Sequence, residues 1–148
     1  MKKFFNNIFR FFGFEVIRSS KEKNSIIILN EEKYEISYKS VSFGGDKYFL
    51  PNYALHRQAA KAFLNGNLQE PDTHKMVEQI CTKRQGSIIH AGAFFGDMLP
   101  SFSKFVQGKV YAFEPVMENF ILGKLTIEAN NLHNVILMNA ALSDNISN

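Results

Sequence analysis

Residues 86–97, GSIIHAGAFFGD, decide the fold class of this 148-residue chain. They begin with a short apolar run at 87–90, continue through a turn between Gly92 and Gly96, and lead into helical spacing at 98–105. A strand, a glycine turn and a helix in this order begin a βαβ unit. The segment therefore predicts a parallel sheet with helices packed against it.

The remaining carboxyl-terminal residues repeat this alternation. Residues 109–114, KVYAFE, predict a second strand, and residues 135–138, VILM, predict a third. Pro115 begins a helix between them that reaches about Asn130. The expected fold class is α/β, with three parallel strands connected through helices.

The residues upstream of this unit predict a small β-rich segment and two helices. Asn52 can cap a helix over residues 53–64, and Pro71 opens the second helix. Short apolar or alternating runs, with a hairpin-like turn at 44–46, predict the strands 25–29, 34–38, 41–43 and 48–50. The buried face expected of the second helix comprises Met76, Val77, Ile80 and Cys81.

Residues 2–12, KKFFNNIFRFF, predict an amphipathic helix, with Phe and Ile on one side and basic or amide residues on the other. Gly13 is a natural stop for it. Asn6, Asn7 and Arg10 interrupt the apolar stretch that a secretory signal requires. Two interpretations stay open: the Phe face docks on the core of the domain, or it lies on an anionic membrane surface or in a partner's groove.

The composition is that of a folded protein and disfavours a nucleic-acid partner. It is 45% hydrophobic and 21% charged, and its net charge of +3 resides in residues 1–20, since the remainder holds 13 basic and 13 acidic residues. One cysteine excludes a disulfide framework, and no apolar run approaches the ~20 residues of a membrane span. We expect a cytoplasmic or membrane-peripheral protein with segments 1–20, 21–85 and 86–148.

Ligand-binding residues are expected where the parallel strands end, because βαβ units bind nucleotide-like ligands at that edge. Gly92 and Gly96 let the backbone approach a ligand beside the amino end of a helix. Glu114 closes the second strand, 22 residues after Gly92, where a carboxylate can accept both hydroxyls of a ribose. Asp144 follows the third strand and could reach an adenine amino group.

The glycine spacing argues against NAD. Dinucleotide-binding turns have the pattern G-x-G-x-x-G, which packs a pyrophosphate against the helix end. Here the pattern from Gly92 to Gly96 is G-x-x-x-G, without an added basic residue. This apolar turn suits a ligand that lacks a pyrophosphate, and S-adenosylmethionine is the obvious candidate. Phe94 and Phe95 within the turn are expected to act as a lid or to pack in the core.

Five segments together carry a family resemblance. They are GSIIHAGAFFGD at 86–97, VYAFEP at 110–115, the asparagines Asn130, Asn131 and Asn134, NAALSD at 139–144, and EPDTH at 70–74. These segments resemble the FkbM family of S-adenosylmethionine-dependent methyltransferases, over about half of the chain. The resemblance implies a seven-stranded class I fold, of which this chain would hold a partial Rossmann-like sheet with its three strands in the order third, second, first from one edge. It also implies methylation of an oxygen on a sugar or small natural product.

The resemblance also implies roles for particular residues. Gly92 and Gly96 correspond to the cofactor turn, Glu114 to the acid that holds the ribose, and Asp144 to the acidic position after the third strand. His90 departs from the class I pattern, which usually places an acid there to hold the methionine end of the cofactor.

Asp97 or Glu70 could supply the missing charge near the methionine end. In a plainer interpretation Asp97 only favours the amino end of a helix, and His90 is only a hydrogen-bonded histidine at a strand end. His56 with Arg57, and His74, could serve an acceptor site or be surface polar residues. The histidines have no metal-ligand spacing, and no catalytic base can be named.

The chain ends at Asn148, just after the third strand. We therefore expect it to hold the cofactor-binding half of a methyltransferase, with the edge of the strand at 87–90 uncovered and open to self-association. A non-catalytic fragment, a module that binds a membrane or a partner, and an NAD-dependent oxidoreductase are the alternatives.

Overall fold

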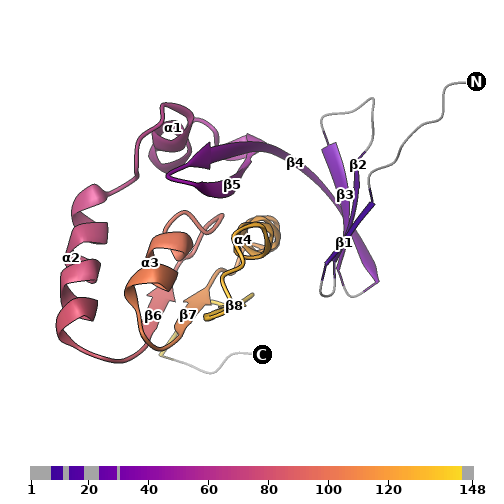
Figure 1. Ribbon diagram of the computed structural model, residues 1–148. Coiled ribbons are helices and arrows are strands. Elements are labelled where there is room, and N and C mark those ends of the chain that lie inside the picture. Colours follow the sequence, from indigo (N-terminus) through magenta and orange to yellow (C-terminus); the bar gives the residue numbers. More distant parts are fainter. Residues whose placement is uncertain (1–7, 12–13, 19–23, 30, 145–148) are drawn as a thin grey trace, which may run out of the picture.

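The computed structural model describes residues 8–11, 14–18, 24–29 and 31–144 (Figure 1). Strands dominate the first third of the chain, and strands alternate with helices in the last third. The elements are β1 (Ile8–Phe11), β2 (Phe14–Arg18), β3 (Asn24–Leu29), β4 (Glu32–Phe43), β5 (Asp46–Pro51), a 3-10 helix η1 (Asn52–Ala54), α1 (Gln58–Leu64), α2 (Pro71–Lys83), β6 (Ile88–Ala91), α3 (Leu99–Phe105), β7 (Val110–Phe113), α4 (Met117–Ala129) and β8 (Val135–Met138).

The first five strands form an antiparallel sheet in chain order. The long strand β4 joins two groups, because its first half, from Glu32 to Ser37, pairs with β3 and its second half, from Tyr38 to Phe43, pairs with β5. Figure 1 shows β4 running from the group β1–β3 to the helical part of the molecule. The turn at Gly44 and Gly45 closes the β4–β5 hairpin, as the glycines predict.

The amphipathic helix predicted over residues 2–12 is wrong where the structure describes it. Residues 8–11 are strand β1, paired with β2 in the register Ile8 with Ile17 and Phe11 with Phe14. Phe and Ile favour strands, and a short run rich in Phe fits the helical repeat of 3.6 residues as well as the strand repeat of two. Pairing with β2 therefore decides that residues 8–11 form a strand. Residues 2–7 and 12 lie outside the described residues. The expected membrane contact depends on an amphipathic helix, which residues 8–11 do not form.

The strands β6, β7 and β8 form a parallel sheet in that order, with Ile88 opposite Val110 and Val110 opposite Val135. This confirms the expected α/β fold class and strand order. In Figure 1, α2 and α3 lie side by side, while α4 lies between this sheet and the β4–β5 hairpin. The βαβ unit therefore packs directly on the antiparallel part of the chain.

The position of α4 explains why its sequence is apolar on nearly all sides. Ile121 and Leu122 pack in a core with Tyr48 of β5, whereas Ile127 packs in a second core with Leu137 of β8. A helix that is buried on two sides has no need of a polar stripe. The helix α4 thus connects the two cores of the molecule.

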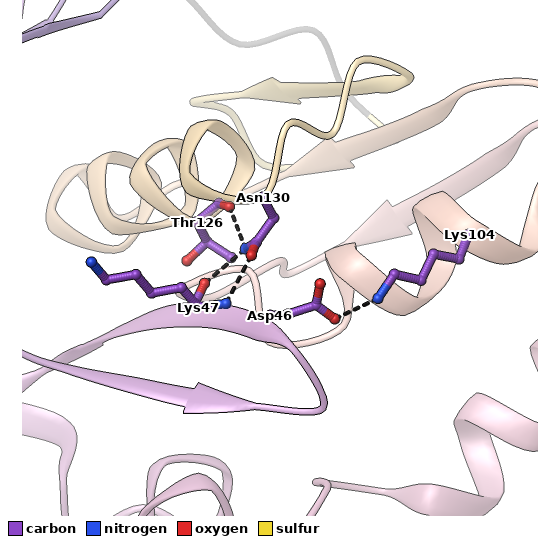
Figure 2. Close-up of polar contacts among 5 residues, drawn as sticks. All are labelled: Asp46, Lys47, Lys104, Thr126 and Asn130. Carbon is purple, nitrogen blue, oxygen red and sulfur yellow. Dashed lines mark hydrogen bonds and ion pairs between the residues drawn. The ribbon is translucent and has the colours of Figure 1, made fainter.

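Polar contacts fix the β4–β5 hairpin on this helix (Figure 2). The Asn130 side chain accepts a hydrogen bond from the Lys47 backbone N–H at 2.8 Å and donates to the Lys47 carbonyl at 2.7 Å. Its Nδ2 also donates to the Thr126 carbonyl at 2.7 Å. Lys104 of α3 forms an ion pair with Asp46 at 2.6 Å. The hairpin turn is therefore held by both α4 and α3.

The helix predicted over residues 53–64 is broken. The Asn52 side chain does not cap it but donates to the Ser37 hydroxyl, and Tyr53 bonds to Asn119 of α4. These contacts tie the first turn, η1, to β4 and α4. The backbone at Arg57 is extended, so α1 begins only at Gln58.

The face that α2 buries is rotated from the predicted one. Met76 and Ile80 are 54% and 52% exposed, whereas His74 is only 4% exposed and contacts the Phe102 ring of α3. His74, half-buried Val77 and half-buried Cys81 lie on one helical face, and this face packs against α3. The strand β6 is also less buried than its sequence predicts, because Ile89 is 71% exposed. Within the described part of the chain, no helix has the length and apolar character needed to cross a membrane.

Candidate ligand-binding site

The turn between β6 and α3 has a backbone shape that requires glycine. Gly92, Phe94 and Gly96 have φ values of +76°, +48° and +81°. Residues other than glycine rarely adopt this left-handed backbone conformation, and Phe94 is one that does. The N–H groups of Gly92 and Ala93 both donate to the carbonyl of Phe113, at 2.8 and 2.9 Å, which fixes the turn beside the end of β7.

The two glycines of the turn face different surroundings. A Cβ on Gly96 would lie 3.2 Å from the Leu99 side chain and 3.4 Å from the Cα of Gly123, so the turn packs tightly on α4. A Cβ on Gly92 would meet no atom within 4 Å. Gly92 therefore borders open space beside the turn. Gly123 is a partner of the turn that sequence reasoning missed, since only the packed structure shows its role.

Alternate residues of the turn enter the two cores of the molecule. Ala93 is fully buried in the core of the parallel sheet, and Phe95 is fully buried in the core of the hairpin, 5.8 Å from the ring of Phe63. The Thr126 hydroxyl donates to the Phe95 carbonyl at 3.0 Å. Phe95 thus packs in the core, one of its two expected roles, and Phe94 is half buried at the edge of a cavity.

A cavity of about 490 Å³ opens beside this turn. Its volume is within the range of sites that hold small ligands, which is roughly 300–1,000 Å³. Four of the predicted residues line it: Gly92 and Asp97 from the turn, His90 from the end of β6, and Glu70 from the amino end of α2. Thr73 and Val77 of α2 also line it. The cavity lies where the end of β6 predicts a ligand site.

Asp97 is a buried acid that lines the cavity, at 7% exposure. Burial raises the pKa of its carboxyl to about 7, because a charged carboxylate is poorly solvated there. The N–H groups of Asp97 and Met98 oppose this rise in the pKa, and the negative charges of Glu70 and Glu114 add to it. The Asp97 carboxyl therefore titrates near neutral pH, and a cationic ligand would stabilise its charged form.

His90 lies in a desolvated environment. Burial lowers the pKa of its imidazole, although the charges of Glu114 and Glu70 act in the opposite direction. Its Nε2 atom is buried without a hydrogen-bond partner in the structure, and its ring meets the Phe102 ring edge-on at 5.3 Å. The expectation of a hydrogen-bonded strand-end histidine therefore does not hold for Nε2.

Glu114 lies directly behind the turn and does not line the cavity. Its side chain is 5% exposed. Its Oε2 accepts the backbone N–H of Phe94 at 2.8 Å, and its Oε1 accepts the N–H of Val116 at 2.9 Å and the Nδ2 of Asn119 at 3.4 Å. The carboxylate thereby connects the turn to the start of α4. A carboxylate has about four acceptor positions, so Oε2 retains one.

Glu70 lines the cavity, whereas Asp144, Arg57 and His56 do not. Glu70 has a left-handed backbone at φ +48° and accepts the Thr73 hydroxyl at 3.1 Å. Asp144 is exposed beyond β8 and does not line the cavity. Arg57 lies over the Phe94 ring, 5.7 Å from its centroid, and His56 is exposed. The described residues contain no group of three His, Cys, Asp or Glu side chains that could hold a metal ion.

Comparisons with known proteins give likenesses in structure only. No family model matches the sequence, and no curated protein matches it. A methyltransferase from Geobacter sulfurreducens is 16% identical, with a TM-score of 0.46 over 60% of this chain and 48% of that chain. TYW2 from M. jannaschii, solved in complex with AdoMet, is 16% identical, with a TM-score of 0.43 over 82% of this chain and 45% of that chain.

Trm5b from Pyrococcus abyssi is 13% identical, with a TM-score of 0.45 over 84% of this chain and 34% of that chain. The chain spans between a third and a half of the length of these three proteins. At such identities the likeness concerns the fold alone.

Proposed function

We propose that this chain is the cofactor-binding part of an S-adenosylmethionine-dependent methyltransferase. One observation carries the proposal. The cavity at the end of β6 is bounded by an open glycine turn and by the carboxyl groups of Glu70 and Asp97, and none of the described residues that line it is a lysine or an arginine. This lining favours a ligand with positive charge over one with a pyrophosphate.

The charge of the ligand distinguishes the two cofactor classes considered. S-adenosylmethionine carries a sulfonium, an ammonium and one carboxylate group, so its net charge is positive, and two nearby carboxyl groups would favour it. NAD carries a pyrophosphate, which those carboxyl groups would repel. Arg57, stacked on Phe94, does not line the cavity. The site therefore suits S-adenosylmethionine better than NAD.

The predicted residues would contact different parts of the ligand. Gly92 would let the ligand approach the backbone of the turn, and Glu70 and Asp97 would hold the amino group of the methionine end. Glu114 would accept a ribose hydroxyl on Oε2, and Asp144 would approach the adenine. His90 would border the methionine end as a neutral side chain.

The bound cofactor would supply an activated methyl group. The contribution of this chain is to bind and orient it and to exclude water from the sulfonium. An oxygen acceptor also needs a base. We assign no described residue to that role. Following the resemblance to the FkbM family, we propose a sugar or small natural product as acceptor. An assay should include tRNA, because aTrm5 solved in complex with tRNALeu is among the similar structures.

Calorimetric titration of the 148-residue chain with S-adenosylmethionine and with NAD tests the proposal. We expect S-adenosylmethionine to bind and NAD to bind at least tenfold more weakly or not at all, with ~1.4 kcal/mol for each factor of ten. Gly92→Ala should weaken binding because its Cβ enters the open space. Gly44→Ala is the matched control, since Gly44 also has a positive φ and open surroundings but lies in the hairpin. Equal or tighter binding of NAD would overturn the proposal.

A further inference from the structure

The outer face of α2 exposes apolar side chains beside the edge of the parallel sheet. Met76 and Ile80 are 54% and 52% exposed, and Ile89 of β6 is 71% exposed. Ile89 lines the same cavity as Thr73 and Val77 of α2, so it lies next to this helix. Large apolar side chains that gather in one exposed region mark an interaction surface, whereas single ones need no explanation.

Charged residues lie at both ends of this apolar pair. At about 100° per residue, four exposed residues of α2 fall within an arc of about 80° and are here called the α2 stripe: Asp72, Met76, Ile80 and Lys83. The stripe is acidic at its amino end, apolar in the middle and basic at its carboxyl end, where Arg84 follows. Both charges also suit the dipole of their own helix, but that role does not account for the exposed apolar pair between them.

The α2 stripe is complementary to itself when a second copy lies antiparallel to it. A two-fold axis midway between Met76 and Ile80 brings each of these residues to the level of the other on the second helix. The same axis brings Asp72 to the level of Arg84, and to within one residue, about 1.5 Å, of the level of Lys83. Apolar side chains therefore meet apolar ones, and acidic side chains meet basic ones, in both halves of an isologous contact.

Other arrangements of the two helices are less favourable. In a parallel pair Asp72 would face its own copy, and so would Lys83, and like charges held close together repel each other. Glu78 lies at the level of the antiparallel axis, but it projects about 160° away from the centre of the stripe, so its two copies do not meet. The charge pattern therefore selects an antiparallel contact with a partner that has the same surface.

The strand β6 extends this surface with an open edge. Within the described part of the chain, β6 pairs with β7 alone. The Ile88 N–H donates to the Lys109 carbonyl at 2.8 Å on the β7 side, so the N–H of the next residue, Ile89, faces the open edge. An open strand edge is a template for pairing with another chain.

The directions of α2 and β6 agree with one common axis. Four residues connect the two elements, and Glu70 at the amino end of α2 lines the cavity together with Gly92 beyond the end of β6. The helix and the strand therefore run in opposite directions. A two-fold axis that places α2 antiparallel to its copy does the same for β6.

We propose that this chain forms a two-fold dimer, in which the α2 stripe and the β6 edge each lie antiparallel to those of a second copy. Met76, Ile80 and Ile89 form the apolar centre of the contact, and the charged ends of the stripe set its direction. A specific interface buries roughly 1,000 Å² or more in total, so the helix and the strand edge contribute together. The contact borders the cavity but does not depend on the proposed function, because no ligand takes part in it.

Sedimentation equilibrium of the 148-residue chain tests the dimer directly. We expect a species with twice the mass of one chain and none larger, because a two-fold contact closes on itself. Ile80→Asp should raise the dissociation constant of the dimer by about tenfold or more, since it places a charge in the apolar centre. Leu142→Asp is the matched control, because Leu142 is 53% exposed and lies beyond β8. The control should leave the dissociation constant unchanged.

Charge reversal tests the direction of the contact. Asp72→Lys brings like charges together and should raise the dissociation constant by about threefold or more. Glu78→Lys makes the same change of charge on the other side of the helix and should have no effect. Adding Lys83→Asp and Arg84→Asp to Asp72→Lys restores opposite charges across the axis, so this charge-swapped variant should dimerise again. Its charges oppose the dipole of α2, so a role in helix stability alone predicts a further loss instead of recovery.

Each other outcome overturns the proposal. A chain that stays monomeric at every concentration, or that associates without limit, has no two-fold contact of this kind. A dimer that survives Ile80→Asp lies on another surface. Failure of the charge-swapped variant to recover would contradict the antiparallel direction. Circular dichroism checks the fold of every variant, and if Ile80→Asp unfolds, the charge-swapped variant decides the question.

Discussion

The β4–β5 hairpin and the β6–β8 sheet are built on different plans, yet they share one helix and one turn. The hairpin is antiparallel and closed by two glycines, and the sheet is parallel and connected through helices. The helix α4 packs on both. The turn at 92–97 contributes Ala93 to one core and Phe95 to the other. The hairpin therefore packs on the same helix and turn that border the candidate site.

The largest expected effect breaks this shared core. Phe95→Ala should lower the free energy of unfolding by about 3–5 kcal/mol, because the ring is fully buried among residues of the hairpin. Chemical denaturation followed by circular dichroism measures it, and we expect one transition for both regions. Leu142→Ala, at a side chain that is 53% exposed, is the control. Two separate transitions in the unmodified chain would show that the regions fold independently.

The second prediction concerns the pH dependence of the sheet region. Between pH 3.8 and about 7, folded Asp97 holds a proton that the unfolded chain has lost, because its folded pKa is raised. Stability should therefore fall as the pH rises through this interval, by at most about 1.4 kcal/mol for each pH unit. The Asp97→Asn variant has no carboxyl to ionise at this position. Its free energy of unfolding relative to that of the unmodified chain should therefore rise from pH 4 to 7.

Melting temperatures at several pH values measure this difference. Burial lowers the pKa values of His90 and His74, so both proteins lose stability as the pH falls below 6.5, and this contribution cancels in the comparison. A difference that stays constant between pH 4 and 7 would contradict the prediction.

The third prediction compares a glycine of each region. Gly44→Ala in the hairpin should cost about 1–2 kcal/mol for the left-handed backbone alone, since its Cβ meets nothing within 4 Å. Gly96→Ala should cost a further 1–3 kcal/mol, or about 2–5 kcal/mol in total, because its Cβ also crowds Leu99 and Gly123. Urea denaturation of both variants measures the difference. Equal losses would mean that the turn is packed no more tightly than the hairpin.

The smallest effects concern the polar contacts in Figure 2. Asn130→Ala should lower the free energy of unfolding by about 1–3 kcal/mol, because it leaves the Lys47 N–H and two carbonyls without this partner. Lys104→Ala should cost less than ~1 kcal/mol, since the Lys104 side chain is 57% exposed and the ion pair is screened. Only the Lys104 effect should vanish in 1 M salt. A larger loss from Lys104→Ala than from Asn130→Ala would reverse this ranking.

The sequence predicts the two regions unequally. The strands and helices of the βαβ unit lie within one or two residues of their predicted bounds, because glycine turns and apolar periods are local signals. The strand β1 could not be predicted, since pairing with β2 overrides a helical pattern in a Phe-rich run. The buried face of α2 was misjudged because His74, a polar residue, lies in it.

The candidate site shows the same division. Gly92, His90, Asp97 and Glu70 could be selected by their positions relative to β6 and α2, and the structure brings them to one cavity. The contributions of other residues come from contacts between distant elements. Gly123 packs on the turn from α4, and Asn119 of the same helix donates to Glu114. Such contacts leave no periodic signal in one sequence.

The central claim is that the turn at 92–97, and not the hairpin, binds S-adenosylmethionine. The most direct measurement is an amide NMR titration of the isotopically labelled chain with S-adenosylmethionine. The account predicts saturable shifts at the amides of Gly92, Phe94 and Asp97, with those of Gly44 and Gly45 unchanged. Saturable shifts centred on the hairpin, or no shifts at 92–97 at saturating ligand, would contradict it.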